Sequence, residues 1–203
     1  MQTQMGASLG MFDQLALMMV MMWPAIPMFL IELHFATNFW RKLEVWTYFV
    51  VILQWIPIAL VLYLLQGAIL YYEVLLGIPF LVFGIILIFA GVVLHAWTAK
   101  LIGIKATIAY TELRPDMSKE NQRLVVSGPF SVVRHPSYWA HTAIITGVFF
   151  VTGIIALAII AVVDLAITYF ITTALEDKEL VERFGNQYRE YQKKVPKFFP
   201  KFR

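Results

Sequence analysis

The apolar residues of this 203-residue chain fall in long, nearly uninterrupted blocks, and this pattern constrains the fold more than any other feature. A helical block of about 20 apolar residues matches the ~30 Å hydrocarbon layer of a bilayer. Only 14% of the residues are charged whereas 60% are hydrophobic. That is too little charge to cover the surface of a soluble domain. The sequence therefore predicts an all-α integral membrane protein.

The lengths of the blocks predict about five membrane-spanning helices. They cover residues 11–31, 45–65, 74–96 and, shared between two helices, 139–175. Pro24 and Pro27 lie in the first block and predict a kink there. The last two helices are expected to turn near Gly153. Because their shared stretch is short for two spans, one or both should be short or tilted.

Basic residues are confined to a few segments of the chain. All 16 lysines and arginines lie in residues 41–42, 100–134 and 178–203. With five spans, these segments are the first loop, the third loop and the C-terminal tail, all on one side of the membrane. The positive-inside rule makes that side cytoplasmic and places the N-terminus outside. The net charge of +3 follows from this topology and does not indicate nucleic-acid binding.

Two segments, the loop 100–136 and the tail after residue 175, contain most of the polar residues. Apolar residues recur through the loop, which predicts that it packs. A stripe of residues recurs through the tail at steps of three and four: Leu180, Phe184, Tyr188, Tyr191 and Val195. This spacing predicts an amphipathic helix that continues through Gly185, packs closely there and ends at Pro196. We expect this helix to fold back against the loop.

The loop and the tail should meet at the mouth of one helical hairpin. Arg134, His135 and Tyr138 lie at the cytoplasmic start of the fourth span. Glu176 and Asp177 lie where the fifth span leaves the membrane. A basic, acidic and aromatic cluster beside lipid is suited to binding an amphiphilic cationic ligand.

Two motifs in this region keep a characteristic order and spacing. The first comprises Leu124-Val125, Gly128-Pro129-Phe130 and Arg134-His135-Pro136-Ser137-Tyr138-Trp139-Ala140. The second comprises Glu176-Asp177, Leu180, Phe184-Gly185, Tyr188, Tyr191, Val195-Pro196 and Pro200. In these motifs residues 122–200 resemble the membrane methyltransferases typified by isoprenylcysteine carboxyl methyltransferase, to which phospholipid N-methyltransferases are related.

The resemblance implies methyl transfer from S-adenosyl-L-methionine to a lipid-like or prenylated acceptor that enters from the bilayer. It implies that the cofactor is bound by Gln122, Arg123, Leu124, Val125, Phe130, His135, Pro136, Ser137, Tyr138 and Glu176. Arg134 and Glu176 are the implied catalytic residues, and Glu176 would hold the amino-acid end of the cofactor. Residues 1–99 would form an N-terminal three-helix membrane region. Residues 100–203 would form the catalytic region, with the loop, the hairpin and a C-terminal amphipathic helix.

One departure from the family pattern concerns the acceptor. Thr172, one helical turn before Glu176, stands where the prenylcysteine enzymes carry an arginine that meets the substrate carboxylate. The absence of this arginine removes a bidentate clamp for the substrate carboxylate. Arg114, Arg123 or Arg134 could replace the clamp in space. A phospholipid amine and a small thiol remain alternative acceptors.

An amine or thiol acceptor has to lose a proton, and the candidate bases are Glu176, Asp177 and His141. His141 and His95 are otherwise expected to be interhelical hydrogen-bond partners. Asp164, near the middle of the fifth span, is predicted to be structural and paired with Gln54 or water. It lies about 18 Å from Glu176 along a helix, too far for direct participation in the same site.

Two other classes of function remain open. A non-enzymatic membrane carrier or assembly factor would bind no methyl donor, and a sterol-reductase-like protein would use NADPH. The four histidines show no spacing typical of metal ligands, so no metal is expected.

Overall fold

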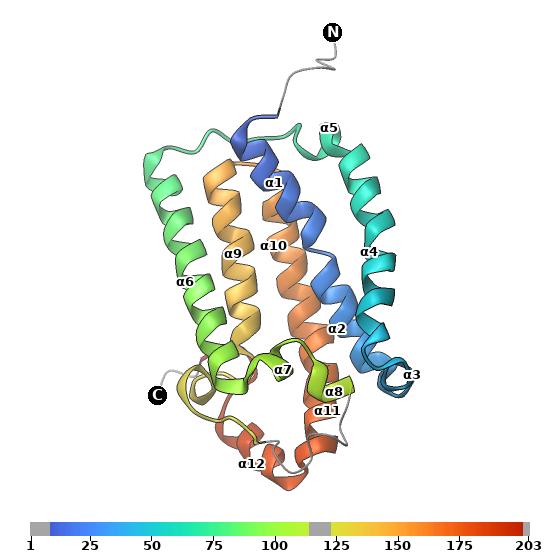
Figure 1. Cartoon of the computed structure of the whole chain (residues 1–203). Coiled ribbons are helices and arrows are strands. Elements are labelled where there is room, and N and C mark those ends of the chain that lie inside the picture. Colours follow the sequence, from blue (N-terminus) through green and yellow to red (C-terminus); the bar gives the residue numbers. More distant parts are fainter. Residues whose placement is uncertain (1–8, 114–122, 201–203) are drawn as a thin grey trace.

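The computed structural model describes residues 9–113 and 123–200, and in these residues the regular secondary structure is helical, with no strand. The elements, shown in Figure 1, are α1 (Met11–Met22), α2 (Ala25–Phe35), α3 (Thr37–Leu43), α4 (Trp46–Leu64), α5 (Gln66–Ile69), α6 (Ile78–Ile102), α7 (Ile104–Thr107), α8 (Tyr110–Leu113), the 3₁₀ turn η2 (Gly128–Ser131), α9 (Pro136–Thr152), α10 (Ile155–Ile167), the π-helical turn η3 (Thr168–Thr172), α11 (Thr173–Phe184) and α12 (Asn186–Lys194).

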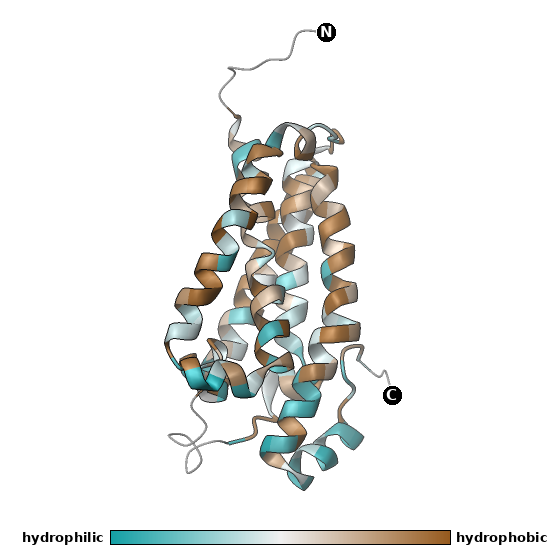
Figure 2. Ribbon diagram, turned by 90° about the vertical axis from the view of Figure 1, so that its right-hand side faces the viewer, coloured by the Kyte–Doolittle hydropathy of each residue, from teal (hydrophilic) through white to brown (hydrophobic). Residues whose placement is uncertain are grey.

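Four helical segments of the described chain are long and apolar enough to cross a membrane. They are Met11–Phe35, Trp46–Leu64, Ile78–Ile102 and Ile155–Phe184. The fifth member of the bundle, α9, has only 17 residues and runs alongside them (Figure 1). The prediction that one of the last two spans is short is thus confirmed. The protein is an all-α integral membrane protein, and hydrophobic residues dominate the bundle helices (Figure 2).

The two ends of the bundle differ in character. α5, the start of α1 and the turn between α9 and α10 lie at one end, whereas α3, α7, α8 and α12 lie at the other (Figure 1). The second end carries the basic segments, with Arg41 and Lys42 in α3 and Lys193 and Lys194 in α12. The hydrophilic colours of Figure 2 also gather there. This arrangement is the one that the distribution of lysine and arginine predicts.

The expected kink in the first span is present, because α1 ends at Met22 and α2 begins after Pro24. The break leaves the last carbonyl groups of α1 without helical donors from a following turn. The indole Nε1 of Trp55, from α4, donates to the carbonyl oxygen of Met21 at 2.8 Å. The kink is therefore fixed by a neighbouring helix.

Two glycines allow α6 and α9 to approach closely. A Cβ at Gly84 would lie 2.6 Å from the carbonyl oxygen of Gly147, and a Cβ at Gly147 would lie 2.7 Å from that of Gly84. Contacts of this kind are typical of membrane helices that pack through small residues. The close contact holds the short helix α9 firmly against α6.

The main hydrophobic core joins α1, α9 and α10. Its buried residues are Ala16, Val20, Ile145, Val148, Ile154, Leu157 and Ala161. The core therefore contains residues from both predicted regions, 1–99 and 100–203. The division between these regions remains a prediction.

The tail departs from the prediction at Gly185. The helix expected to continue through this residue is broken there, so that α11 ends at Phe184 and α12 begins at Asn186. Gly185 has φ +57° and ψ −129°, a conformation essentially restricted to glycine. The expected close packing is also wrong, because nothing lies within 4 Å of a Cβ built at this position. The glycine permits a sharp turn, and the predicted C-terminal amphipathic helix is divided between α11 and α12.

Candidate active site

The segment that precedes α9 is folded by its two prolines and held by the C-terminal tail. Pro129 lies in the 3₁₀ turn η2, and Pro136 is the first residue of α9, where its missing N–H is not needed. Between them, the backbone N–H of Arg134 donates to the carbonyl oxygen of Pro196 at 3.0 Å. The hydroxyl of Tyr191 donates to the carbonyl oxygen of Phe130 at 2.5 Å. The tail thus closes over this segment.

Arg134, an implied catalytic residue, fastens the tail to the hairpin. Its Nη2 lies 2.7 Å from Oδ2 of Asp177, and its Nη1 donates to the carbonyl oxygens of Gln192 at 3.2 Å and Val195 at 3.3 Å. Its side chain is only 10% exposed. One guanidinium therefore joins Asp177, 43 residues downstream, to Val195, 61 residues downstream.

His135 lies between the two carboxylates of the hairpin. Its Nδ1 is 3.1 Å from Oε2 of Glu176, and its Nε2 is 2.9 Å from Oδ1 of Asp177. Burial disfavours the imidazolium, but the two carboxylates outweigh burial and raise the pKa of His135 to about 9. His135 is therefore a cation at neutral pH, with both ring nitrogens acting as donors.

Two tyrosines complete this cluster. The hydroxyl of Tyr138 donates to Oε2 of Glu176 at 2.9 Å, and the hydroxyl of Tyr188 donates to Oδ1 of Asp177. Burial and the neighbouring Asp177 carboxylate raise the pKa of Tyr188, so this phenol stays protonated. Each carboxylate is thus fixed by His135 and by one tyrosine. Asp177 is further paired with Arg134, whereas Glu176 faces the cavity described next.

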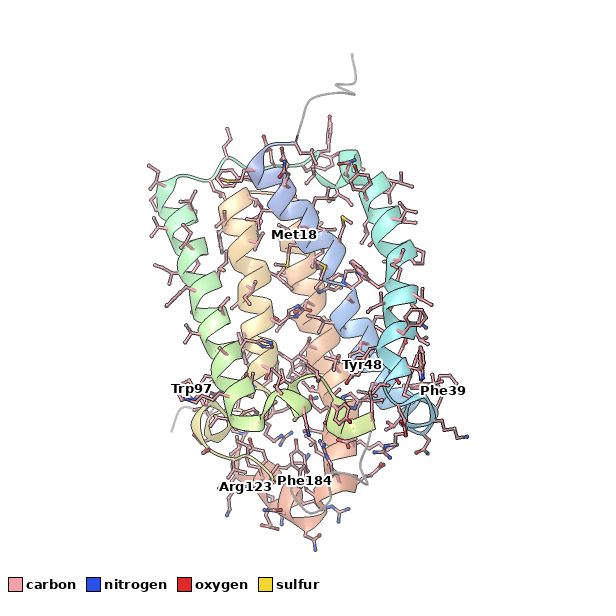
Figure 3. All side chains as sticks on the ribbon, viewed as in Figure 1. Met18, Phe39, Tyr48, Trp97, Arg123 and Phe184 are labelled. Carbon is pink, nitrogen blue, oxygen red and sulfur yellow. The ribbon has the colours of Figure 1, made fainter. Side chains whose placement is uncertain are left out.

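A cavity of about 880 Å³ lies beside this cluster. Most of the predicted cofactor-binding residues line it: Arg123, Leu124, Val125, Phe130, His135, Ser137, Tyr138 and Glu176. Arg134 also lines it. Pro136 is buried beside the cavity and does not line it, and Gln122 lies outside the described residues. Figure 3 shows Arg123 and Phe184, another lining residue, at the end of the molecule that carries α12.

The same cavity continues between the membrane-spanning helices. This part is lined by apolar side chains of α2, α4 and α9: Ile26, Phe29, Leu30, Val51, Ile52 and Ile144. Ile26 and Ile52 are 46% and 53% exposed, which places them at the surface of the bundle that faces lipid. Tyr48, at the base of α4 (Figure 3), donates its hydroxyl to the carbonyl oxygen of Ile108 at 2.8 Å. One cavity therefore joins a charged end with an apolar end.

Comparison with known proteins agrees with this geometry. A model of the phospholipid methyltransferase family matches residues 79–187, more than half of the chain. The chain belongs to the phospholipid methyltransferase family. The matched residues include α6, α9, α10 and α11, and thus Glu176 and the segment from Phe130 to Tyr138.

Two curated relatives of this phospholipid methyltransferase family member are named as metal-resistance proteins. They are the cobalt-zinc-cadmium resistance protein CzcN of Cupriavidus metallidurans and the nickel-cobalt-cadmium resistance protein NccN of Alcaligenes xylosoxydans xylosoxydans. Each is 32% identical over 83 residues, which are 41% of this chain and 38% of the relative. The match thus spans less than two fifths of each relative. No solved structure matches the chain.

The described residues contain no group of three or more His, Asp or Glu side chains that could hold a metal ion. The histidines of the chain do not share a common set of contacts. His135 belongs to the carboxylate cluster, and His141 lies 3.2 Å from Asp164. The latter contact confirms the prediction that His141 is an interhelical partner. The same role for His95 stays a prediction.

For Asp164, the predicted pairing with Gln54 is wrong, whereas the alternative of a water partner stays a prediction. Its carboxylate does not pair with Gln54. Trp23 Nε1 and Thr142 Oγ1 each donate to it at 2.8 Å, and Nδ1 of His141 lies 3.2 Å away. Trp23 lies at the break between α1 and α2 and reaches Asp164 from there. The lengths of the apolar blocks in the sequence do not predict this position.

Thr172, at the position of the missing arginine, is 1% exposed, and its hydroxyl has no hydrogen-bond partner among the described residues. Of the arginines considered as replacements, Arg134 is engaged by the tail, and Arg123 lines the cavity. Arg114 lies outside the described residues.

Sequence reasoning missed several lining residues. Nδ1 of His34, on α2, is buried without a hydrogen-bond partner among the described residues, and His34 lines the cavity. Arg183 lines it too, with Nη1 3.0 Å from Oε1 of Glu112 and Nη2 3.1 Å from Oε2 of Glu179. The polar face of the tail pattern could have indicated Arg183. No local signal marks His34, because only the packing of α2 against α11 brings it to the site.

Proposed function

We propose that this membrane methyltransferase transfers the methyl group of S-adenosyl-L-methionine to an apolar acceptor that reaches the site from the bilayer. The observation that carries the proposal is the single cavity, which joins the Glu176 end with the apolar end between α2, α4 and α9. A water-soluble cationic donor suits the first end, and a lipid-like acceptor suits the second. Both ends would then meet within one enclosed space.

The residues at the charged end fit the donor. Glu176 offers a carboxylate in a partly water-excluded place, where attraction to an ammonium or a sulfonium is stronger than in water. Phe130 and Tyr138 supply aromatic walls. Leu124 and Val125 lie outside any helix, so their backbone N–H and C=O groups are not engaged in helical hydrogen bonds. The unpartnered Nδ1 of His34 has hydrogen-bonding capacity that a ligand could satisfy. The volume of about 880 Å³ is within the range of pockets that hold cofactors.

The sulfonium of the bound donor supplies a methyl group that is already activated for displacement. The protein has to bind, orient and exclude water, and alignment of this kind can contribute about 7–11 kcal/mol. Glu176 is held in position for this task by His135 and Tyr138. Arg134 acts through the tail, which it keeps closed over the pocket.

The acceptor is a carboxylate, an amine or a thiol with an apolar substituent. An isoprenylcysteine-like carboxylate is supported by the sequence motifs, whereas the buried Thr172 in place of an arginine favours an amine or a thiol. We also propose that the end of the bundle with α12 is cytoplasmic, since the basic residues of α3, α7 and α12 lie there, and that the N-terminus is outside.

The test is calorimetric binding of S-adenosylhomocysteine to the purified protein in detergent. For Glu176→Gln we expect affinity to fall by at least about tenfold, because a charge-assisted contact is worth roughly 1.5–3 kcal/mol. Glu190→Gln is the matched control: this glutamate lies on α12, is 59% exposed and pairs with Lys193. The affinity of Glu190→Gln for S-adenosylhomocysteine should equal that of the parent.

Other outcomes separate the alternatives. Absence of binding by a well-folded parent would contradict the proposal and favour a carrier or assembly factor. Binding of NADPH in place of S-adenosylhomocysteine would favour a reductase. Equal affinity in the parent and Glu176→Gln would place the donor elsewhere.

A further inference from the structure

The buried acid in the middle of the bundle has a complete set of partners. Asp164 on α10 is 1% exposed. Trp23 Nε1 donates to its Oδ1 and Thr142 Oγ1 donates to its Oδ2, each at 2.8 Å. Nδ1 of His141 lies 3.2 Å from the same Oδ1. Two side chains of α9 and one from the break between α1 and α2 therefore hold this carboxylate in one orientation, with one oxygen directed at the imidazole.

The imidazole of His141 connects this buried carboxylate to the cavity. His141 lines the cavity and its side chain is 17% exposed. A carboxylate next to Nδ1 favours the tautomer with the proton on Nδ1, which leaves the lone pair on Nε2. Among the described residues, the partner of the His141 side chain is Asp164, which contacts Nδ1. Nε2 is thus left to accept a proton from a ligand.

The position of His141 is also the one that a base would need. Tyr138 contacts Glu176 at the charged end of the cavity. His141 comes three residues after Tyr138, which is about 4.5 Å further along the axis of α9. The next cavity-lining residue of α9 is the apolar Ile144. His141 therefore lies between the charged end of the cavity and its apolar end, where donor and acceptor would meet.

The other candidate bases are already engaged. Asp177 is contacted by Arg134, His135 and Tyr188, and Glu176 is contacted by His135 and Tyr138. A carboxylate that faces a cationic histidine is a weak base. Of the three candidate bases, His141 is the one that combines a place on the cavity wall with an orienting carboxylate behind it.

We propose that His141, oriented by Asp164, is the general base of the transfer, and that the acceptor is a thiol or an amine with an apolar substituent. This inference rests on the proposed function. The S–H or N–H bond of the acceptor breaks, its proton goes to Nε2 of His141, and the electron pair stays on the acceptor atom. That pair forms the bond to the methyl carbon, while the bond from that carbon to the donor sulfur breaks and its electrons remain on sulfur. The imidazolium then returns the proton to water.

The deciding experiment uses acceptors that differ in their need for a base. Purified protein is given labelled S-adenosyl-L-methionine and either a hydrophobic alkanethiol, an alkylamine or an aromatic thiol that is largely ionised at neutral pH. In His141→Asn, the amide can still donate to Asp164 but the Nε2 base is absent. We expect the alkanethiol or alkylamine rate to fall by roughly 10²-fold or more, the usual contribution of a general base. The rate with the ionised thiol should stay near that of the parent.

A binding measurement checks the same step without turnover. With S-adenosylhomocysteine bound, a chromophoric thiol is added at a pH where it is neutral in water. The parent should bind it as the thiolate, seen by absorbance, whereas His141→Asn should bind it as the neutral thiol. Asp164→Asn, which keeps one acceptor oxygen and removes the charge of the carboxylate, tests the positioning role. It should show a smaller loss with the same dependence on the acceptor.

The possible failures can be told apart. Calorimetric binding of S-adenosylhomocysteine reports that each variant is folded, and His141→Gln is the second variant should His141→Asn not bind. A parent that binds no S-adenosylhomocysteine overturns the proposed function together with this inference. A parent that methylates only carboxylates, or a variant that loses all acceptors equally, overturns this inference alone.

Discussion

His135 is the residue on which the charged end of the cavity depends. Its ring contacts both Glu176 and Asp177, and it is almost completely buried, with 2% of its side chain exposed. Two buried carboxylates would repel each other without this cation between them. Its charge therefore keeps Glu176 in place before any ligand binds, and a neutral His135 would weaken the whole cluster.

This coupling predicts a specific pH dependence of stability. His135 has a pKa of about 9 in the folded protein, raised from 6.5. The folded state therefore holds its proton more tightly, and this stabilisation, on the order of 3 kcal/mol, is complete below pH 6.5 and is lost as the pH rises through 9. We expect the unfolding temperature of the parent to fall between these values more steeply than that of His135→Gln. Parallel curves would show that His135 is neutral when folded.

At the scale of elements, the break between α11 and α12 is what brings the tail to the pocket. α11 continues the last span, and α12 turns away at Gly185, so that Tyr188 and Tyr191 reach Asp177 and Phe130. A straight helix would carry these tyrosines away from the hairpin. One residue in a conformation that strongly favours glycine therefore decides whether the charged end of the cavity is covered.

Substitution of Gly185 should accordingly destabilise the tail. Gly185→Ala meets no steric obstacle, but it forces a Cβ onto φ +57° at a cost of about 1–3 kcal/mol. Gly67→Ala is the matched control, because nothing lies within 4 Å of its Cβ either and its φ is not positive. Limited proteolysis should cut the tail of Gly185→Ala faster than that of Gly67→Ala. Equal cleavage would mean that α12 is held without the turn.

At the scale of the whole molecule, the described basic residues of α3, α7, α11 and α12 lie at the end of the bundle that carries the charged part of the cavity. The chain has no cysteine, so single introduced cysteines report on sidedness without background. In intact cells, Lys42→Cys and Lys193→Cys should be protected from a membrane-impermeant thiol reagent, whereas Gln66→Cys at α5 should react. The reverse pattern would invert the proposed topology, and reaction of all three would contradict five spans.

Much of this architecture could be predicted because it depends on local properties of the sequence. Hydropathy marks the spans, and the order of the motif residues anticipates that His135, Tyr138 and Glu176 meet. The break at Gly185 could not be predicted, since the apolar period continues through it unchanged. The contact from Trp23 to Asp164 depends on where a kinked helix lies in space, as does the position of His34. Such contacts between distant segments leave no periodic trace.

The clamp formed by Arg134 with Gln192 and Val195 has a consequence for biosynthesis. A chain grows from its N-terminus at about 5–20 residues per second, so the bundle helices α1 to α10 leave the ribosome before α12, the helix that covers the charged end of the cavity. Bundle and pocket are thus completed at separate moments. A nascent protein can already be anchored in the membrane while the charged end of its cavity is still open. Under the proposed function, it can hold a methyl donor only when α12 arrives.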